Sequence, residues 1–190
     1  MSQALDAYAR AAAAVERLIG QVEDWGRPTP CTDWDVRTLV NHMTTGELVF
    51  AAIMRGDPPP DQAAGHLGTD PVAGFRSAAG QFSAAASAPG VAQRKFPTPF
   101  GEQPAGMIVM LRTAELLVHG WDLARALGAS PDALPADLAE DAVGQWRERL
   151  AAMPRAEGGP LGVEQPAPAG APAPDRLAAL FGRRLDWSPA

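Results

Sequence analysis

The stretch "TAELLVHGWDLARALG", residues 113–128, has the pattern of a helix that carries ionisable residues beside its buried face. Apolar residues recur in it at helical spacing, and a glycine closes it. On a helical wheel the apolar arc spans roughly 0–60° from Ala114, while Asp122 falls at about 80° and Glu115 at about 100°. His119 follows at about 140°. Because buried carboxylates are costly unless they are paired, protonated or bound to a metal, these residues need a structural or chemical explanation.

The overall composition is that of an ordinary globular domain. The chain has 190 residues, of which 46% are hydrophobic and 20% are charged, so it is long enough for one domain with a real core. Its formal net charge is -6, and it contains no run rich in Lys or Arg. A nucleic-acid partner is therefore not expected, because phosphate backbones are bound through basic surfaces.

Neither a membrane span nor a disulfide is expected. Asp6, Arg10 and Glu16 interrupt the first helix-like segment, which leaves no uncharged core for a signal peptide or a transmembrane helix, so the protein is expected in the cytoplasm. Cys31 is the single cysteine, which excludes an intramolecular disulfide and a multi-cysteine zinc site. We expect Cys31 to be a small buried residue in a turn, although the following helix N-terminus could stabilise its thiolate.

Cap residues and stretches rich in Pro and Gly divide the chain, and they predict a series of helices separated by long loops. Thr32, with Asp35 three residues later, resembles a capping box, and Asp70 before a proline resembles a second helix start. Short extended pieces are expected around Phe96 and Phe100, but no strand alternates long enough for a large sheet. The fold class is therefore all-α. The expected helices cover residues 3–24, 33–55, 70–88, 102–127 and 136–153.

The C-terminal part has a different composition from the rest. Residues 1–155 are expected to form a helical bundle, and residues 156–190 an extended segment that crosses it. Pro, Ala and Gly dominate this segment, which is also typical of a disordered tail. Against disorder, "DRLAALFG" has Asp175 as a cap, an apolar face and Gly182 as a stop, so a last short helix should dock on the bundle.

Two of the ionisable residues in the opening stretch are spaced like ligands of one metal ion. Glu115 and His119 lie one helical turn apart, about 6 Å along the axis, and such side chains can converge on a cation. A divalent ion needs at least one more ligand, and His42, on the flank of the second helix's apolar arc, is the favoured one. His66 is the competitor, but it falls in a loop. The alternative is a set of hydrogen-bonded core residues with chance spacing.

Two further residues could support this site. Asp122 is the candidate to accept the second N–H of His119, as carboxylates do behind metal-bound imidazoles, or it could pair with Arg125 or be exposed. Arg112, three residues before Glu115, could neutralise that carboxylate or attract an anionic substrate; a solvated arginine is the commoner outcome. Catalytic residues beyond the ligands are not indicated.

Two stretches also resemble a known family. "RPTPCTDWDVRTLVNHM" and "ELLVHGWDLARALG" resemble the second-helix and fourth-helix motifs of the DinB-like four-helix superfamily, in the branch of mycothiol-dependent maleylpyruvate isomerase. The C-terminal part is similar to the ending of shorter relatives that lack the isomerase's larger C-terminal domain. The resemblance implies a four-helix bundle, here with an extra helix, that holds a divalent metal, commonly zinc. Its ligands would be His42, Glu115 and His119.

Such a site favours one class of function. A site of two histidines and a carboxylate leaves a position open, as catalytic zinc sites do. If a thiol occupies the open position on the metal, the resemblance favours a mycothiol-type transferase or isomerase acting on a small electrophile. If water occupies that position, the protein would be a hydrolase. A non-catalytic metal-binding or sensor module is the third hypothesis. The sequence indicates neither the electrophile nor the oligomeric state.

Overall fold

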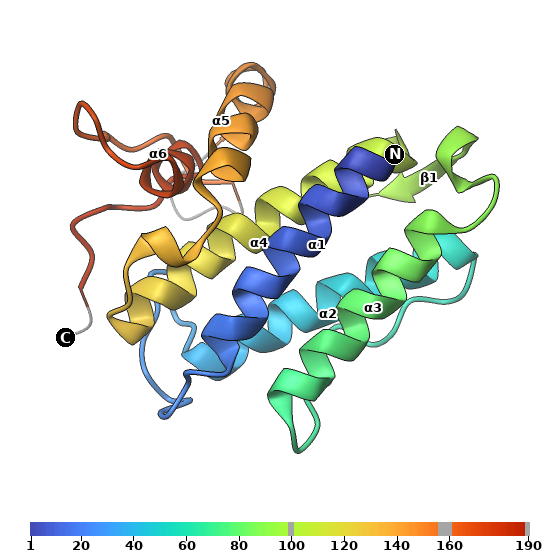
Figure 1. The fold of residues 1–190 in the computed structure, drawn as a ribbon, viewed down its shortest axis with the longest axis horizontal. Helices are drawn as coiled ribbons and strands as arrows, with labels where there is room; N and C mark the ends of the chain where they lie inside the picture. The colour runs from blue at the N-terminus through green and yellow to red at the C-terminus, as the bar shows by residue number, and fades with distance from the viewer. Residues whose placement is uncertain (99–100, 156–160, 189–190) are drawn as a thin grey trace.

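The backbone is an all-α bundle of four long helices with two further helices on one side of it (Figure 1). The computed structural model describes the chain except for residues 99–100, 156–160 and 189–190. Helix α1 packs against α3 and α4, and α2 packs against α3 and α4, which closes the bundle. The bundle helices are α1 (Ser2–Ile19), α2 (Val36–Arg55), α3 (Pro71–Ser87) and α4 (Ala105–Leu127).

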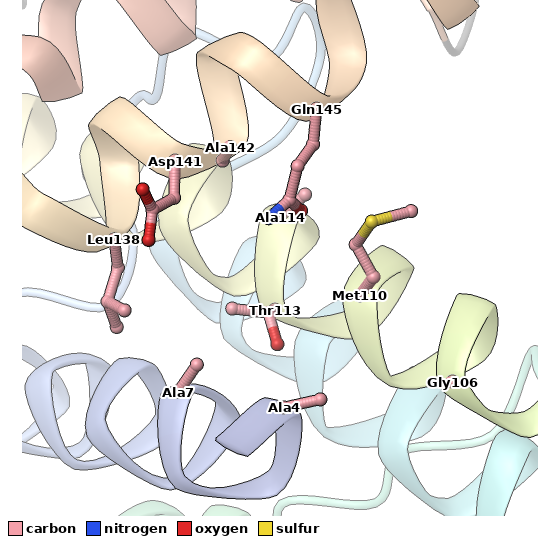
Figure 2. Close-up of a pocket in the computed structure, with 10 residues that line it drawn as sticks. All are labelled: Ala4, Ala7, Gly106, Met110, Thr113, Ala114, Leu138, Asp141, Ala142 and Gln145. Atoms are coloured by element: carbon pink, nitrogen blue, oxygen red, sulfur yellow. The ribbon is translucent and has the colours of Figure 1, made fainter. Parts of the chain in front are cut away.

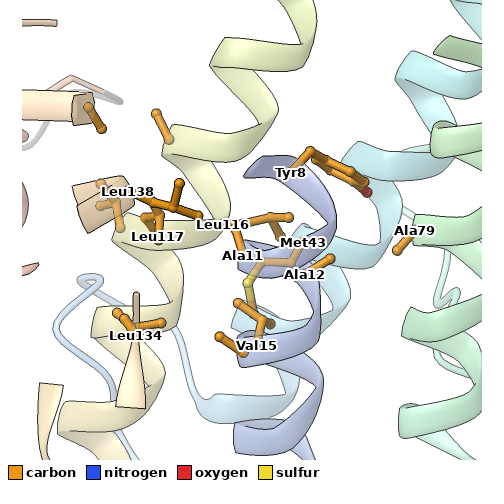
Figure 3. Packing of buried hydrophobic residues seen from close by; sticks show 14 of the residues in the cluster. Tyr8, Ala11, Ala12, Val15, Met43, Ala79, Leu116, Leu117, Leu134 and Leu138 are labelled. Atoms are coloured by element: carbon orange, nitrogen blue, oxygen red, sulfur yellow. The ribbon is translucent and has the colours of Figure 1, made fainter. Parts of the chain in front are cut away.

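The bundle core combines small and large residues of α1, from Ala11 to Tyr8, with apolar residues of its neighbours. Figure 3 shows Ala11 and Val15 of α1 together with Met43 of α2 and Leu116 of α4 in this buried cluster. Close approach of α1 and α4 requires Gly120, because a Cβ there would lie 3.1 Å from a methyl carbon of Val15. The fold therefore places α4 in the middle of the molecule, in contact with helices on several sides.

The start of α2 differs from the sequence-based prediction. Asp35, not Thr32, is the N-cap, and its carboxylate accepts the backbone N–H of Thr38 at 2.7 Å. The prediction that this helix begins at residue 33 is wrong. Asp33 has φ 64°, a left-handed conformation that cannot belong to a right-handed helix, and α2 begins three residues later, at Val36. The cap expected at Asp70 is confirmed, since its side chain accepts the N–H of Ala73 at 3.0 Å.

A small hairpin replaces the expected first residues of the fourth helix. Strand β1 (Lys95–Thr98) pairs antiparallel with β2 (Gly101–Pro104), and a 3-10 turn, η1 (Val91–Gln93), precedes it. The helix therefore begins at Ala105 rather than at residue 102, after Pro104 at the N-cap. The extended piece expected around Phe96 is confirmed, whereas Phe100 lies outside the described residues.

The C-terminal part lies along the side of the bundle next to α4. Helix α5 (Ala136–Ala151) follows a short turn, η2 (Pro131–Ala133), and α6 (Ala173–Leu180) packs on α5 and α4 (Figure 1). The N-cap of α6 is Pro172, so the expected cap role of Asp175 is wrong. Asp175 instead lies in the first turn and accepts the indole N–H of the fully buried Trp121 at 2.7 Å. This bond joins the C-terminal segment to α4.

Among the residues that the structure describes, no helix combines the length and the apolar character that crossing a bilayer requires.

We expect Asp175→Ala to destabilise the protein by about 1–3 kcal/mol, because the buried Trp121 N–H would lose its acceptor. Asp175→Asn is the matched control, since its amide oxygen can still accept the bond while the charge is removed in both variants. Urea unfolding followed by circular dichroism measures both. Equal stabilities of the two variants would show that the hydrogen bond does not hold α6 in place.

Candidate metal centre

The imidazole rings of His42 and His119 meet at the interface between α2 and α4. Their centroids lie 4.9 Å apart with the rings at 73°, an edge-to-face arrangement. Trp34, from the turn before α2, packs on both rings, with centroids 4.8 Å from His42 and 6.0 Å from His119. Trp34 is partly buried and forms one wall of this pair.

His42 is held in the form that binds metal ions. Burial, and after it the neighbouring His119, lowers the pKa of His42 to about 4, against the opposite effect of Glu115. The ring is therefore neutral at pH 7, with a free lone pair. In the described part of the chain, no residue makes a hydrogen bond to it. An unbonded neutral imidazole beside another imidazole is a suitable arrangement for ligation.

Glu115 lies one turn before His119 on α4. Burial would raise the pKa of its carboxyl, but Arg112 and the two imidazoles together hold that pKa below its usual value. Its side chain is 32% exposed, against 2% for Arg112, its ion-pair partner, so solvent can reach the carboxylate. Glu115 acts electrostatically on both histidines, but among the described residues these three are not one of the groups whose ligand atoms all lie within 4.8 Å of one another.

The other nitrogen of His119 is occupied. Nδ1 lies 3.0 Å from Oδ2 of Asp122, which is fully buried. Burial would raise the pKa of Asp122, but Arg183 and the His119 hydrogen bond lower it to about 2. Because Asp122 is an anion, Nδ1 carries the proton and donates, which leaves Nε2 as the nitrogen available to a metal.

Two residues that the sequence did not single out for this site complete the environment of Asp122. Arg183, in the chain after α6, donates to Asp122 through Nε at 3.1 Å and through a terminal nitrogen at 2.9 Å. The Cys31 thiol donates to the same carboxylate at 3.2 Å. Burial, and after it the negative charge of Asp122, raises the pKa of Cys31 to about 12, so it is a thiol and the thiolate alternative is wrong. Arg125 bonds to backbone carbonyls and does not pair with Asp122.

Cys31, His119 and Asp122 form a second possible ligand group. Among the described His, Cys, Asp and Glu residues, these three form the one group whose possible ligand atoms all lie within 4.8 Å of one another. Its atoms already bond to one another, and the Arg183 guanidinium bonds to both the carboxylate and, at 3.5 Å, the sulfur. A cation would have to share this space with a positive charge. The group is therefore better described as a hydrogen-bonded support behind His119.

Arg112 is buried rather than solvated, which corrects the expectation from the sequence. Only 2% of its side chain is exposed, and it forms ion pairs with Glu115 and, at 3.0 Å, with the fully buried Glu47 of α2. Glu47 lies on a different face of α2 from His42, about 140° around the helix. His66 lies in an exposed loop, where its Nε2 is 2.8 Å from the carbonyl oxygen of Asp61.

The opposite face of α4 carries a separate shallow cavity. It has a volume of about 210 Å³ and lies between α1, α4 and α5. Figure 2 shows its lining, which is mostly small and apolar and includes Thr113 and Ala114. These residues fall about 100–160° around α4 from Glu115 or His119, so this cavity does not open onto the imidazole pair.

The fold and the site together define a class of protein. A bundle of four long helices in which two imidazoles meet between α2 and α4 is a DinB-like bundle. Within that class, the chain belongs to the family of the mycothiol maleylpyruvate isomerase N-terminal domain, whose pattern it matches over residues 5–124.

The chain is also similar to two uncharacterized proteins of Mycobacterium tuberculosis, one from strain CDC 1551 / Oshkosh and one from strain H37Rv. Each is 35% identical over 184 residues, which cover 95% of this chain and 98% of the relative. The similarity therefore extends through the C-terminal segment, beyond the residues that match the family. No solved structure matches the chain significantly.

We expect Arg183→Met to destabilise the protein by about 3–5 kcal/mol, because it leaves the buried Asp122 carboxylate without its cation. Adding Asp122→Asn to this variant should recover part of the loss, which a double-mutant cycle in urea measures. Arg184→Met is the control, since the adjacent arginine pairs with Asp186 at the surface and should leave stability close to wild type. Additive effects of the two substitutions at 122 and 183 would contradict a coupled pair.

Proposed function

We propose that the chain binds a divalent metal ion through His42, Glu115 and His119, and that it uses a mycothiol-type thiol to modify a small electrophile. The observation that supports this most directly is the contact of two partly buried imidazoles from different helices, one neutral and unbonded and the other oriented by a carboxylate. The coupling of Glu115 to both rings adds the anionic donor.

The donor set suits zinc better than the harder divalent ions. Two imidazole nitrogens and one carboxylate oxygen are common ligands of catalytic zinc, whereas calcium and magnesium prefer oxygen alone. Protein ligands at three positions leave room for one further molecule, which a structural site with four protein ligands would not.

The family suggests which molecule this is. Its description names mycothiol, and a divalent ion at this site would lower the pKa of a thiol and so supply a nucleophile at neutral pH. The chain's own residues have supporting roles. Asp122 fixes the tautomer of His119, and Trp34 provides an apolar wall against both imidazoles. The reaction class that follows is thiol transfer or thiol-assisted isomerisation.

Protein purified without chelators should contain about one divalent ion per chain, and His42→Ala should lose it, because a ligand from α2 is removed. His66→Ala is the matched control, since this exposed loop histidine should not affect the metal content. Plasma emission spectroscopy measures both.

Cys31→Ser separates the two possible ligand groups in the same measurement. The proposed ligand set predicts that this variant keeps its metal, because Cys31 only supports Asp122. Loss of metal from Cys31→Ser, with retention in His42→Ala, would move the site to the Cys31, His119 and Asp122 group.

Titrating a cobalt-substituted sample with mycothiol should produce an intense sulfur-to-metal absorption band, because a thiolate would join the open position. A thiol-free analogue of the same sugar is the control and should leave the spectrum unchanged. An unchanged spectrum at millimolar mycothiol would exclude thiol chemistry at this centre. Turnover of ester or amide substrates without thiol would then favour a hydrolase.

A further inference from the structure

Helix α2 carries a slot built for the guanidinium of Arg112. The group lies directly on the α2 backbone at Gly46, where an added Cβ would come within 2.6 Å of a guanidinium nitrogen. The Phe50 ring lies 5.4 Å away on one side, and the carbonyl oxygen of Met43 lies 3.5 Å from the same nitrogen on the other. Residues 43, 46, 47 and 50 share one face of α2 at helical spacing. This face of α2 therefore accommodates the guanidinium of Arg112 from α4.

The hydrogen bonds of Arg112 divide between two carboxylates. One terminal nitrogen donates to Oε1 of Glu47 at 3.0 Å and to the Met43 carbonyl. The other donates to Oε2 of Glu115. In the described structure no donor reaches Oε1 of Glu115, so that oxygen keeps its lone pairs.

This division matters because Arg and a carboxylate prefer to pair through two parallel bonds. If Arg112 turned both terminal nitrogens to Glu115, the carboxylate would have both oxygens engaged. Glu47 prevents this by holding one nitrogen on α2, where Glu47 itself is fully buried beside the Tyr8 hydroxyl. A buried ion pair is by itself a poor way to gain stability, which points to another reason for its presence.

We propose that Glu47 and Arg112 are positioning residues that present Oε1 of Glu115 to the metal ion, an inference that rests on the ligand set proposed above. Neither residue touches the ion. Glu47 fixes Arg112 in the α2 slot, and Arg112 fixes one oxygen of Glu115, which leaves the other free to ligate.

The test is the zinc affinity, measured by competition with a chromophoric chelator, together with the visible spectrum of the cobalt-substituted protein. Glu47→Gln keeps the shape and should weaken zinc binding roughly 10- to 100-fold, the usual effect of removing a support behind a ligand. Thr44→Val is the matched control, because this buried α2 residue only bonds to the Val40 carbonyl and its substitution should leave affinity unchanged.

A second variant changes no charge. Gly46→Ala forces the guanidinium out of its slot, so it should also weaken zinc binding and shift the cobalt spectrum. The gain in helix propensity offsets part of the cost of this displacement, so the variant should fold with a lowered unfolding temperature. This variant decides the question if Glu47→Gln does not fold. A purely structural role for Arg112 predicts wild-type affinity in every variant that folds.

The outcomes separate this inference from the proposed function. Wild-type protein that binds no zinc overturns both. Loss of zinc in Glu115→Gln, with wild-type affinity in Glu47→Gln and Gly46→Ala, keeps the ligand set and overturns the positioning role. Weakened affinity in both of the latter variants, with Thr44→Val unchanged, supports the role proposed here.

Discussion

Helix α4 carries four ionisable side chains on one face, and their need for partners governs much of the structure around it. Arg112, Glu115, His119 and Asp122 follow one another at intervals of three, four and three residues, so they form one stripe. Two of them, Arg112 and Asp122, are almost completely buried. Charges in such a position are tolerated only with opposite charges nearby. α4 therefore requires Glu47 from α2 and Arg183 from the C-terminal segment.

The C-terminal segment is for this reason part of the site rather than an appendage. Arg183 lies outside residues 5–124, which match the family, but it provides the positive charge that keeps Asp122 anionic. The same segment is tied to α4 by the bond between Trp121 and Asp175 and by Arg125, which donates to the carbonyl of Trp187 at 2.7 Å. The orientation of His119 thus depends on residues that follow the bundle by some 60 positions.

The sequence was sufficient where the determinants are local. Helical periodicity and the Asp70 cap predicted the bundle, and wheel positions placed Glu115 and His119 beside the buried face. It was insufficient where two distant segments decide the outcome. Arg112 looked solvated because nothing within α4 shows that α2 provides a glycine gap and a carboxylate for it.

The other residues that the sequence did not predict for the site were missed for the same reason, because their partners lie far away in the chain. Arg183 pairs with Asp122 across 61 residues, and Arg112 pairs with Glu47 across 65 residues, in both cases without any periodic signal in the sequence. The displaced start of α2 is different, because it depends on one backbone angle at Asp33 that the capping pattern does not encode.

The ion pairs along α4 leave one carboxylate open to solvent. Asp122 pairs with Arg183 and Glu47 pairs with Arg112, and both of these carboxylates are fully buried. Glu115 also pairs with Arg112 but keeps 32% of its side chain exposed. For this reason Glu115 is the carboxylate of the stripe that we propose as the anionic ligand. A divalent ion held there would remain positive after binding one carboxylate and two neutral imidazoles, and it would therefore favour the thiolate form of a bound thiol.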